Sequence, residues 1–337
     1  MRKFSLFSVV AILCLLTLFP TVVMAQDPDP DPDLTVLWHG DARDVVISPD
    51  RKKIVFSYSY WIYTVDLESG DYTLISSDSR SEHPTWSPDG SIAYSFYGDN
   101  GYVLAIVNSA GDKQIIADDL YWPTWSPTAN RILAKDLAQN LYLLYQDQDG
   151  QNWNKTLLGQ GSNPVWSPDG SSFLFETYRD GNSEIYRGDK YGANLVNLTN
   201  HAKADYAPSW SIDGLWIVFD SNRDANFSPY DRNYELYRMD FYTLDVTRLT
   251  FDVGLDAFSD ISQEGRIIYL SEAAGLVVSG KPTLLVDTGV QLASINARRI
   301  YWLDNHKILV EGYDNKIVTL LVDPYDFYLP LIARLDY

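Results

Sequence analysis

The sequence predicts an all-β protein, a seven-bladed β-propeller of four-stranded antiparallel blades. A phrase centred on tryptophan recurs about every 40 residues, which is the period of a propeller blade. Each interval also holds four short β-rich runs separated by turn residues. The clear copies read PTWSPDG at 84–90, PTWSP at 123–127, PVWSPDG at 164–170 and PSWSIDG at 208–214.

Weaker copies of the phrase, ISPD at 47–50, ISQEG at 261–265 and WLDN at 302–305, raise the number of units to seven. The tryptophan position, here called the anchor, is expected to fill the wedge between neighbouring blades rather than to stack on a ligand. The seven anchors are Ile47, Trp86, Trp125, Trp166, Trp210, Ile261 and Trp302.

Each unit contains four predicted strands, called A to D in chain order. Strand A ends at the anchor, and residues 54–58, 61–66 and 72–75 exemplify strands B, C and D. Antiparallel strands alternate in direction, so the D-to-A and B-to-C loops share one face of the propeller. That face is called the D-to-A/B-to-C face below. The A-to-B turns, often Ser-Pro-Asp-Gly, lie on the opposite face.

Both ends of the chain carry a run that resembles a strand D. Residues 34–39 (LTVLWH) are expected to complete the last blade, which contains Trp302, because closing the ring removes exposed sheet edges. Residues 327–332 would then form an extra edge strand or a cap. The reverse assignment of the two runs stays open.

The N-terminal segment predicts export. Residues 1–25 carry Arg2 and Lys3 before an apolar run that ends in Val-Met-Ala, as in a cleavable signal peptide. Residues 26–33 alternate Asp and Pro and form a spacer, and the propeller spans 34–337. After cleavage no membrane span is expected, and Cys14, the only cysteine, is removed. We therefore expect a secreted or periplasmic monomer.

The charge limits the partners. Loss of two cations with the signal moves the net charge from −19 to −21, which disfavours nucleic acid and anionic surfaces. No G-x-S-x-G motif occurs, so the sequence offers no nucleophile elbow for peptidase activity.

The repeats resemble those of the TolB-like propellers, a WD40-like family built on P-x-W-S-P-D-G. The longer family phrase resembles YRDGNSEIY at 178–186, and NLT at 197–199 and RLT at 248–250 resemble its strand-D ending. The resemblance implies the fold. It does not imply an activity, because related proteins include a Tol–Pal component, peptidase propellers and oligogalacturonate lyases. TolB combines a six-bladed propeller with an N-terminal α/β domain, so its role is not transferred to this chain.

Lyases of this superfamily bind a metal through histidines near the channel. Three histidines fall in D-to-A loops, and they make weak metal-ligand candidates: His39, His83 and His201. They precede their anchors by eight, three and nine residues, so the spacing does not imply that they converge. No cofactor is predicted, although a divalent cation at the channel mouth would suit such a site.

The fifth unit is the most irregular. Its B-to-C loop is expanded over 222–232, and the following D-to-A loop spans 251–258. Asp205 and Asp256 both lie five residues before an anchor and are expected at the channel mouth. The ligand-binding candidates are Asp205, Tyr206, Asp256, Arg223, Asp224 and Tyr230.

These observations predict a non-catalytic propeller that binds a protein or cell-envelope ligand through its D-to-A/B-to-C face. The alternative is a metal-dependent polysaccharide lyase or hydrolase that acts at the channel mouth.

Overall fold

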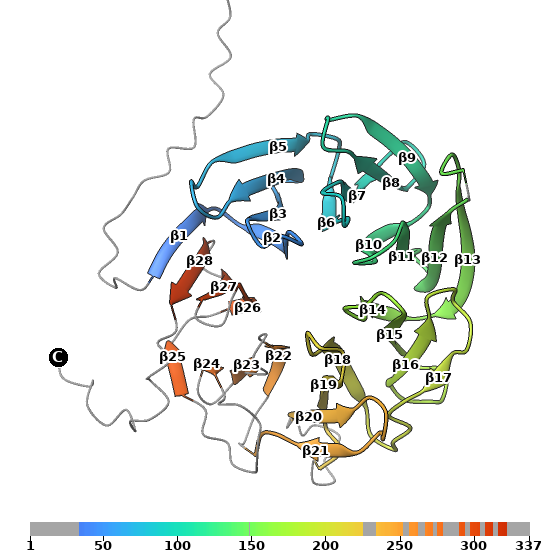
Figure 1. Ribbon diagram of the computed structural model, residues 1–337, viewed down its shortest axis with the longest axis vertical. Helices are drawn as coiled ribbons and strands as arrows, with labels where there is room; N and C mark the ends of the chain where they lie inside the picture. The colour runs from blue at the N-terminus through green and yellow to red at the C-terminus, as the bar shows by residue number, and fades with distance from the viewer. Residues whose placement is uncertain are drawn as a thin grey trace, which may run out of the picture.

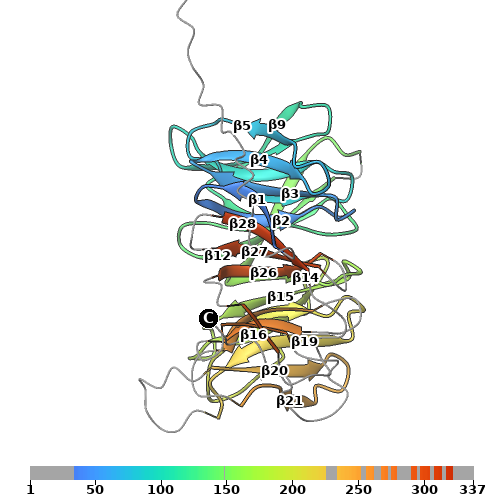
Figure 2. The ribbon, with the colours of Figure 1, turned by 90° about the vertical axis from the view of Figure 1, so that its left-hand side faces the viewer.

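The computed structural model describes residues 34–147, 149–224, 234–251, 256–261, 267–271, 275–278, 290–293, 297–303, 307–312 and 316–321. Within these ranges the chain forms strands and turns, and it contains no helix. The strands make seven four-stranded antiparallel sheets, which surround a common centre (Figure 1) and form a flattened body when seen edge-on (Figure 2). The prediction of an all-β propeller with four-stranded antiparallel blades is confirmed.

Six of the sheets each use four consecutive strands. The first sheet contains β2 (Ala42–Ile47), β3 (Lys53–Tyr58), β4 (Trp61–Asp66) and β5 (Tyr72–Ser76). The second contains β6 (Glu82–Trp86), β7 (Ile92–Tyr97), β8 (Tyr102–Val107) and β9 (Lys113–Asp118), and the third contains β10 (Tyr121–Trp125), β11 (Arg131–Lys135), β12 (Asn140–Gln146) and β13 (Trp153–Gln160). The fourth sheet contains β14 (Ser162–Trp166), β15 (Ser172–Thr177), β16 (Glu184–Asp189) and β17 (Val196–Asn197). The fifth contains β18 (Asp205–Trp210), β19 (Trp216–Ser221), β20 (Glu235–Asp240) and β21 (Val246–Arg248), and the sixth contains β22 (Asp256–Ile261), β23 (Ile267–Ser271), β24 (Gly275–Val278) and β25 (Val290–Ala293).

The remaining sheet joins the two ends of the ring. It contains β26 (Ala297–Trp302), β27 (Lys307–Gly312), β28 (Lys316–Leu321) and, outermost, β1 (Leu34–His39). β1 pairs antiparallel with β28, from Leu34 opposite Leu320 to His39 opposite Lys316. The prediction that residues 34–39 complete the blade of Trp302 is therefore confirmed. Residues 1–33 and 327–332 lie outside the described residues.

The Ser-Pro-Asp-Gly phrase forms the A-to-B turns. In the fourth sheet the Asp169 carboxylate accepts hydrogen bonds from the Ser167 hydroxyl at 2.6 Å and from the Ser171 N–H at 3.0 Å. Gly170 follows with φ +64°, a left-handed conformation that glycine adopts without strain. The fifth sheet repeats the bond between its serine and aspartate, Ser211 to Asp213, at 2.6 Å. Local hydrogen bonding thus explains why the phrase recurs.

The hydrophobic core lies between neighbouring sheets. Trp125, for example, packs with Leu104 of the preceding sheet and Leu144 of its own. The Trp86 indole N–H donates to the Val46 carbonyl of the preceding sheet at 3.1 Å, as that of Trp166 does to the Thr124 carbonyl. Each such tryptophan joins two sheets, which holds the innermost strands around the centre at fixed spacing.

Among the described residues, none forms a helix of the length and apolarity needed to cross a membrane.

Candidate functional site

Strand A of each sheet is the innermost strand, and a β-bulge interrupts it at the same place. Each of the seven A strands shows a register shift near the position three residues before its anchor. At this bulge position five residues adopt left-handed φ values between 48° and 57°: Asp44, His83, Trp122, Asn163 and Ala207. Such a conformation costs a non-glycine residue roughly 1–2 kcal/mol, so the surrounding contacts must impose it.

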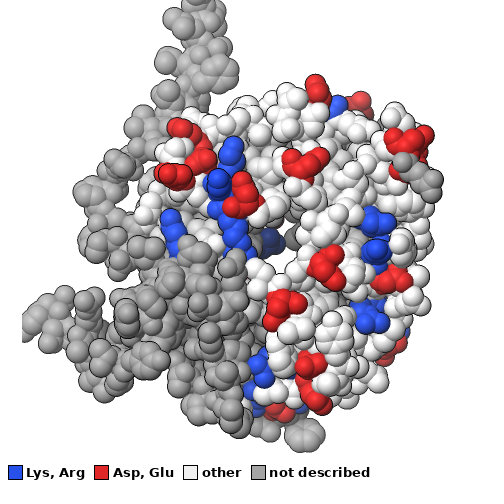
Figure 3. Space-filling view, viewed as in Figure 1, with Lys and Arg blue, Asp and Glu red and all other residues white. Residues whose placement is uncertain are grey.

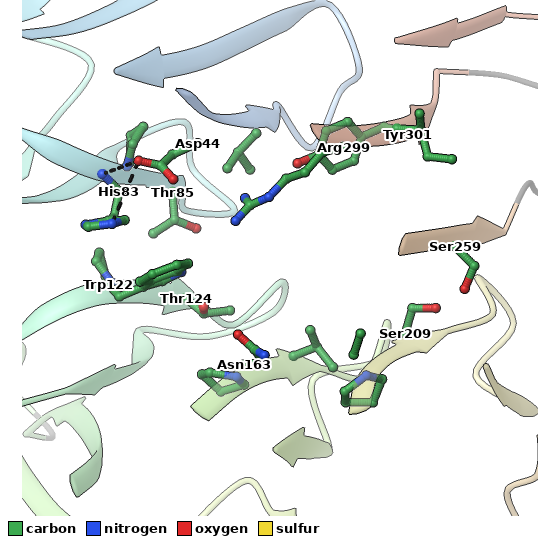
Figure 4. Close-up of a pocket in the computed structure, with 18 residues that line it drawn as sticks. Asp44, His83, Thr85, Trp122, Thr124, Asn163, Ser209, Ser259, Arg299 and Tyr301 are labelled. Atoms are coloured by element: carbon green, nitrogen blue, oxygen red, sulfur yellow. Dashed lines mark hydrogen bonds and ion pairs between the residues drawn. The ribbon is translucent and has the colours of Figure 1, made fainter. Parts of the chain in front are cut away.

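The bulges place different side chains around one central cavity of about 370 Å³. The five left-handed residues line it together with Arg299, which occupies the bulge position of the last sheet. Deeper in the cavity the wall is formed by the residues after the bulge, including Thr85, Thr124 and Ser209. Figure 4 shows the Arg299 side chain reaching into this space from β26, with Asp44 and Thr85 on one side and Thr124 and Asn163 on another.

Four carboxylates, of which Asp44 lines the cavity, accept backbone N–H groups of strand A from the next sheet. Asp44 accepts the His83 N–H at 3.3 Å, and Glu176 accepts the Ala207 N–H at 2.6 Å. Asp260 accepts the Trp302 N–H at 2.7 Å. A bulge leaves N–H groups out of the strand ladder, so these bonds satisfy donors that would otherwise be buried without an acceptor.

The fourth carboxylate of this kind is Glu311, which accepts the Val45 N–H at 3.3 Å. Burial raises the pKa of Glu311, and it also raises the pKa of Asp260, whose backbone bonds counteract it only in part. Carboxylates buried at sheet boundaries therefore serve the architecture of the channel, while the bulge side chains are left to vary.

Aromatic rings extend the site outward over the second and third sheets. The His83 ring stacks on the Trp122 ring, with their centroids 4.4 Å apart. The ammonium of Lys135, on β11, lies 4.7 Å from the centroid of the Trp122 ring. Burial lowers the pKa of His83, and the opposing effect of Asp44 does not outweigh it. The imidazole is therefore neutral at neutral pH. Tyr121 stacks on Tyr102 at 4.9 Å and extends this rigid aromatic surface.

Comparison with known proteins shows a resemblance to one family, over a part of the chain that includes Trp122, Asn163 and Ala207 but not Asp44, His83 or Arg299. The sequence profile of the TolB β-propeller domain matches residues 117–281. This match covers just under half of the chain and shows a resemblance to that family. The resemblance predicted from the repeated phrase is thereby confirmed.

The relative found by sequence is distant. An uncharacterized protein of Agrobacterium fabrum is 26% identical over 177 residues, which cover 48% of this chain and 59% of the relative. The matched part thus spans less than two thirds of that relative's length.

Two solved structures are similar in fold. The Cps50 (Swd1) β-propeller domain of Myceliophteria thermophila has a TM-score of 0.66 at 11% identity and covers 86% of this chain and 100% of its own. An oligogalacturonate lyase in complex with manganese has a TM-score of 0.63 at 15% identity, with coverage of 89% and 93%. At these identities the likeness concerns the fold alone.

Within this propeller, two of the ligand-binding candidates predicted from the sequence bind each other. Asp205 is fully buried, and its carboxylate pairs with the Arg223 guanidinium at 2.9 Å. Arg223 also lies 5.0 Å from the Phe219 ring and 4.8 Å from the Tyr237 ring. Asp205 does not line the central cavity, in contrast to the expectation that it edges the channel mouth. Asp205 begins β18 and lies opposite Ser221, the last residue of β19, so its carboxylate joins the two strand ends through Arg223.

The other candidates are dispersed. Asp224 is exposed, pairs with Arg248 at 3.2 Å and accepts a hydrogen bond from Tyr237. The Tyr206 hydroxyl lies 2.8 Å from that of Tyr178 on the D-to-A/B-to-C face. Asp256 begins β22, but its side chain lies outside the described residues, as do Tyr230 and residues 225–233.

The three histidines do not form one group in the described structure. His83 lines the cavity, whereas His39 ends β1, the outermost strand of its sheet. The His201 ring accepts the Lys203 N–H at 3.1 Å within its own loop. Within the described ranges no three His, Cys, Asp or Glu side chains are grouped to hold a metal ion.

The sequence reasoning missed most of the cavity wall. Asp44, Trp122, Asn163 and Arg299 were not candidates, although each stands three residues before an anchor. Comparing that column across the repeats would have shown that its side chains differ in charge, size and polarity from unit to unit, while the flanking proline and tryptophan recur. A variable column beside an invariant phrase is the signal that could have found the site.

Proposed function

We propose that the chain is an exported, seven-bladed binding propeller. It holds a protein or cell-envelope ligand over the central cavity, on the D-to-A/B-to-C face, and performs no chemistry itself. The observation that carries the proposal is the convergence of six different side chains on one cavity through a bulge repeated in every strand A. Binding function commonly resides on such variable positions of a rigid scaffold.

Exposed tyrosines on the D-to-A/B-to-C face also support binding at that face. Tyr60 and Tyr97 expose 53% and 43% of their surface there, and Arg80 lies between their rings at 5.5 and 5.6 Å. Tyrosine, tryptophan and arginine are the residues on which interfaces concentrate their binding energy. The resemblance of residues 1–25 to a cleavable signal peptide supports a secreted or periplasmic location.

The test uses a variant that fills the cavity. In Thr124→Trp an indole would occupy the space between Asn163 and Trp122, whereas Gln151→Trp places the same group on an exposed turn at the opposite face of the same sheet. Immobilised protein is incubated with native envelope extract, and bound components are quantified. We expect Thr124→Trp to lose at least ten-fold in specific capture and Gln151→Trp to match the wild type. Equal capture by all three proteins would refute a role for the cavity.

The lyase alternative makes a separate prediction. Cleavage of oligogalacturonate by the purified chain with added manganese, abolished by His83→Ala, would replace the non-catalytic assignment. In the described part of the cavity wall His83 is the only histidine, so it is the side chain to vary.

A further inference from the structure

The guanidinium of Arg299 is a cationic group in the central cavity to which no role has been assigned above. Among the described residues that line the central cavity, Arg299 is the only lysine or arginine. In the space-filling view the centre of the disc is hollowed, and atoms of a basic side chain are visible inside the hollow (Figure 3). Figure 4 shows the Arg299 side chain directed into this space rather than along the wall.

No carboxylate of the described residues forms an ion pair with Arg299. The described ion pairs use other cations, and the adjacent Arg298 takes Asp41 at 2.7 Å. The two acids whose charges act on Arg299 each accept other donors. Asp44 accepts the His83 N–H and the Ser57 hydroxyl, and Glu311 accepts the Val45 N–H.

Arg299 nevertheless remains charged. Burial acts to lower the pKa of its guanidinium, but Tyr301, Asp44 and Glu311 together raise it above its ordinary value. Arg299 is partly buried, and its side-chain hydrogen bond is to Tyr301 and not to a carboxylate. Its charge therefore carries a desolvation cost, and an anion that enters the cavity would offset that cost. The planar fork of a guanidinium fits a carboxylate through two parallel hydrogen bonds.

The surroundings restrict the anion to a single carboxylate on a neutral or basic chain. Asp44 stands at the same rim as Arg299, so a doubly charged group such as a phosphate would meet a carboxylate with only one cation to balance it. The net charge of −19 for the whole chain also repels a polyanion. Thr85, Thr124 and Asn163 supply hydroxyl and amide groups, which suit peptide bonds next to the carboxylate.

We propose that the cavity binds the free C-terminal carboxylate of a partner protein, with Arg299 as the carboxylate-binding residue. The inference rests on the proposed function and specifies the chemistry of its protein ligand. A cavity of about 370 Å³ accommodates the last one or two residues of a chain, while the remainder crosses the aromatic surface of His83, Trp122 and Tyr121.

The experiment compares two pools of randomised N-acetylated tetrapeptides, one with free C-terminal carboxylates and one with C-terminal amides. Equilibrium dialysis against the full chain, read by mass spectrometry, gives the retained fraction. We expect retention of members of the carboxylate pool and at least ten-fold weaker retention of their amides. This comparison uses the wild-type protein, so it does not depend on the folding of any variant.

Three variants assign the effect to Arg299. Arg299→Met is expected to lower retention of the carboxylate pool at least ten-fold, and Arg299→Lys is expected to restore part of it, because a lysine keeps the charge and loses the fork. Arg298→Met, on the same strand, is expected to retain the wild-type preference. Near-UV circular dichroism checks that each variant keeps its aromatic packing.

Several outcomes would overturn the inference. Equal retention of both pools, or retention that survives Arg299→Met, would remove the carboxylate from recognition. Arg299-dependent binding of digalacturonate without binding of either pool would assign the cavity to an acidic sugar instead. If neither pool binds while Thr124→Trp still abolishes capture from the envelope extract, the proposed function stands and the C-terminal carboxylate is excluded. Failure of both experiments would refute the proposed function itself.

Discussion

Single carboxylates hold the channel wall together at the residue scale. Glu176 shows it most fully: it is only 4% exposed, and it accepts the Ala207 N–H at 2.6 Å, the Asn163 amide at 2.9 Å and the Ser162 hydroxyl at 3.3 Å. One side chain therefore satisfies donors from two neighbouring sheets. A buried donor without an acceptor costs about 1–3 kcal/mol, so the group matters far more than its own burial area suggests.

Glu176→Ala is expected to lower the free energy of unfolding by roughly 3 kcal/mol, because it leaves the Ala207 and Asn163 donors without an acceptor. Urea unfolding followed by circular dichroism gives the value. Glu176→Gln keeps one acceptor oxygen and is expected to fall between the wild type and the alanine variant. A loss below about 0.5 kcal/mol for the alanine variant would show that water takes over the bonds.

The repeated A-to-B turn offers a test at the scale of the element. Gly90 and Gly170 occupy the same turn position with φ +83° and +64°. A Cβ at Gly90 would meet nothing within 4 Å, whereas at Gly170 it would lie 2.1 Å from the Thr128 hydroxyl of the neighbouring sheet. The two glycines thus separate the backbone cost of the turn from a contact between sheets.

Gly90→Ala is expected to cost about 1 kcal/mol, the price of a left-handed alanine, and Gly170→Ala about 1–3 kcal/mol more from overpacking. Thermal unfolding of both variants measures the difference. Adding Thr128→Ala to Gly170→Ala is expected to recover part of the loss. Equal destabilisation by the two single variants would mean that the turn of the fourth sheet moves away from Thr128 freely.

The bulges also explain why the sequence predicted the blades but not the residues of the cavity wall. The spacing of the tryptophan phrase identified the blades, their four strands and the ring-closing segment 34–39, because turn chemistry and strand periodicity are local properties. The cavity wall depends on a bulge that changes the side-chain alternation of strand A. No single repeat reveals that change, and only a comparison of the position three residues before the anchor across all repeats indicates it. The pairing of Asp205 with Arg223, 18 residues apart, was equally hidden, since it depends on the register in which β18 pairs with β19.

At the scale of the whole molecule, stability depends on how the ring closes. β1 pairs with β28 in the last sheet, yet its Trp38 packs against the first: the ring centroid lies 4.9 Å from Phe56 and 5.3 Å from Tyr58. Trp38 is 1% exposed and Leu37 is 4% exposed. One strand thus completes the hydrogen bonding of one sheet and the hydrophobic contact with the next.

Removal of residues 26–39 is expected to destabilise the whole ring, whereas removal of 26–33 alone is expected to leave it unchanged. Loss of Trp38 alone costs about 3–5 kcal/mol, and the deletion would also expose the edge of β28 to pairing with other molecules. Since domains of this kind are stable by about 5–15 kcal/mol, the shorter protein is expected to unfold at much lower urea concentration and to aggregate in size-exclusion chromatography. Trp38→Ala and Leu37→Ala keep the strand, so they separate the effect of side-chain packing from that of covering the edge of β28. If the deletion lowers the stability no more than Trp38→Ala does, the hydrogen bonds of β1 contribute little to closing the ring.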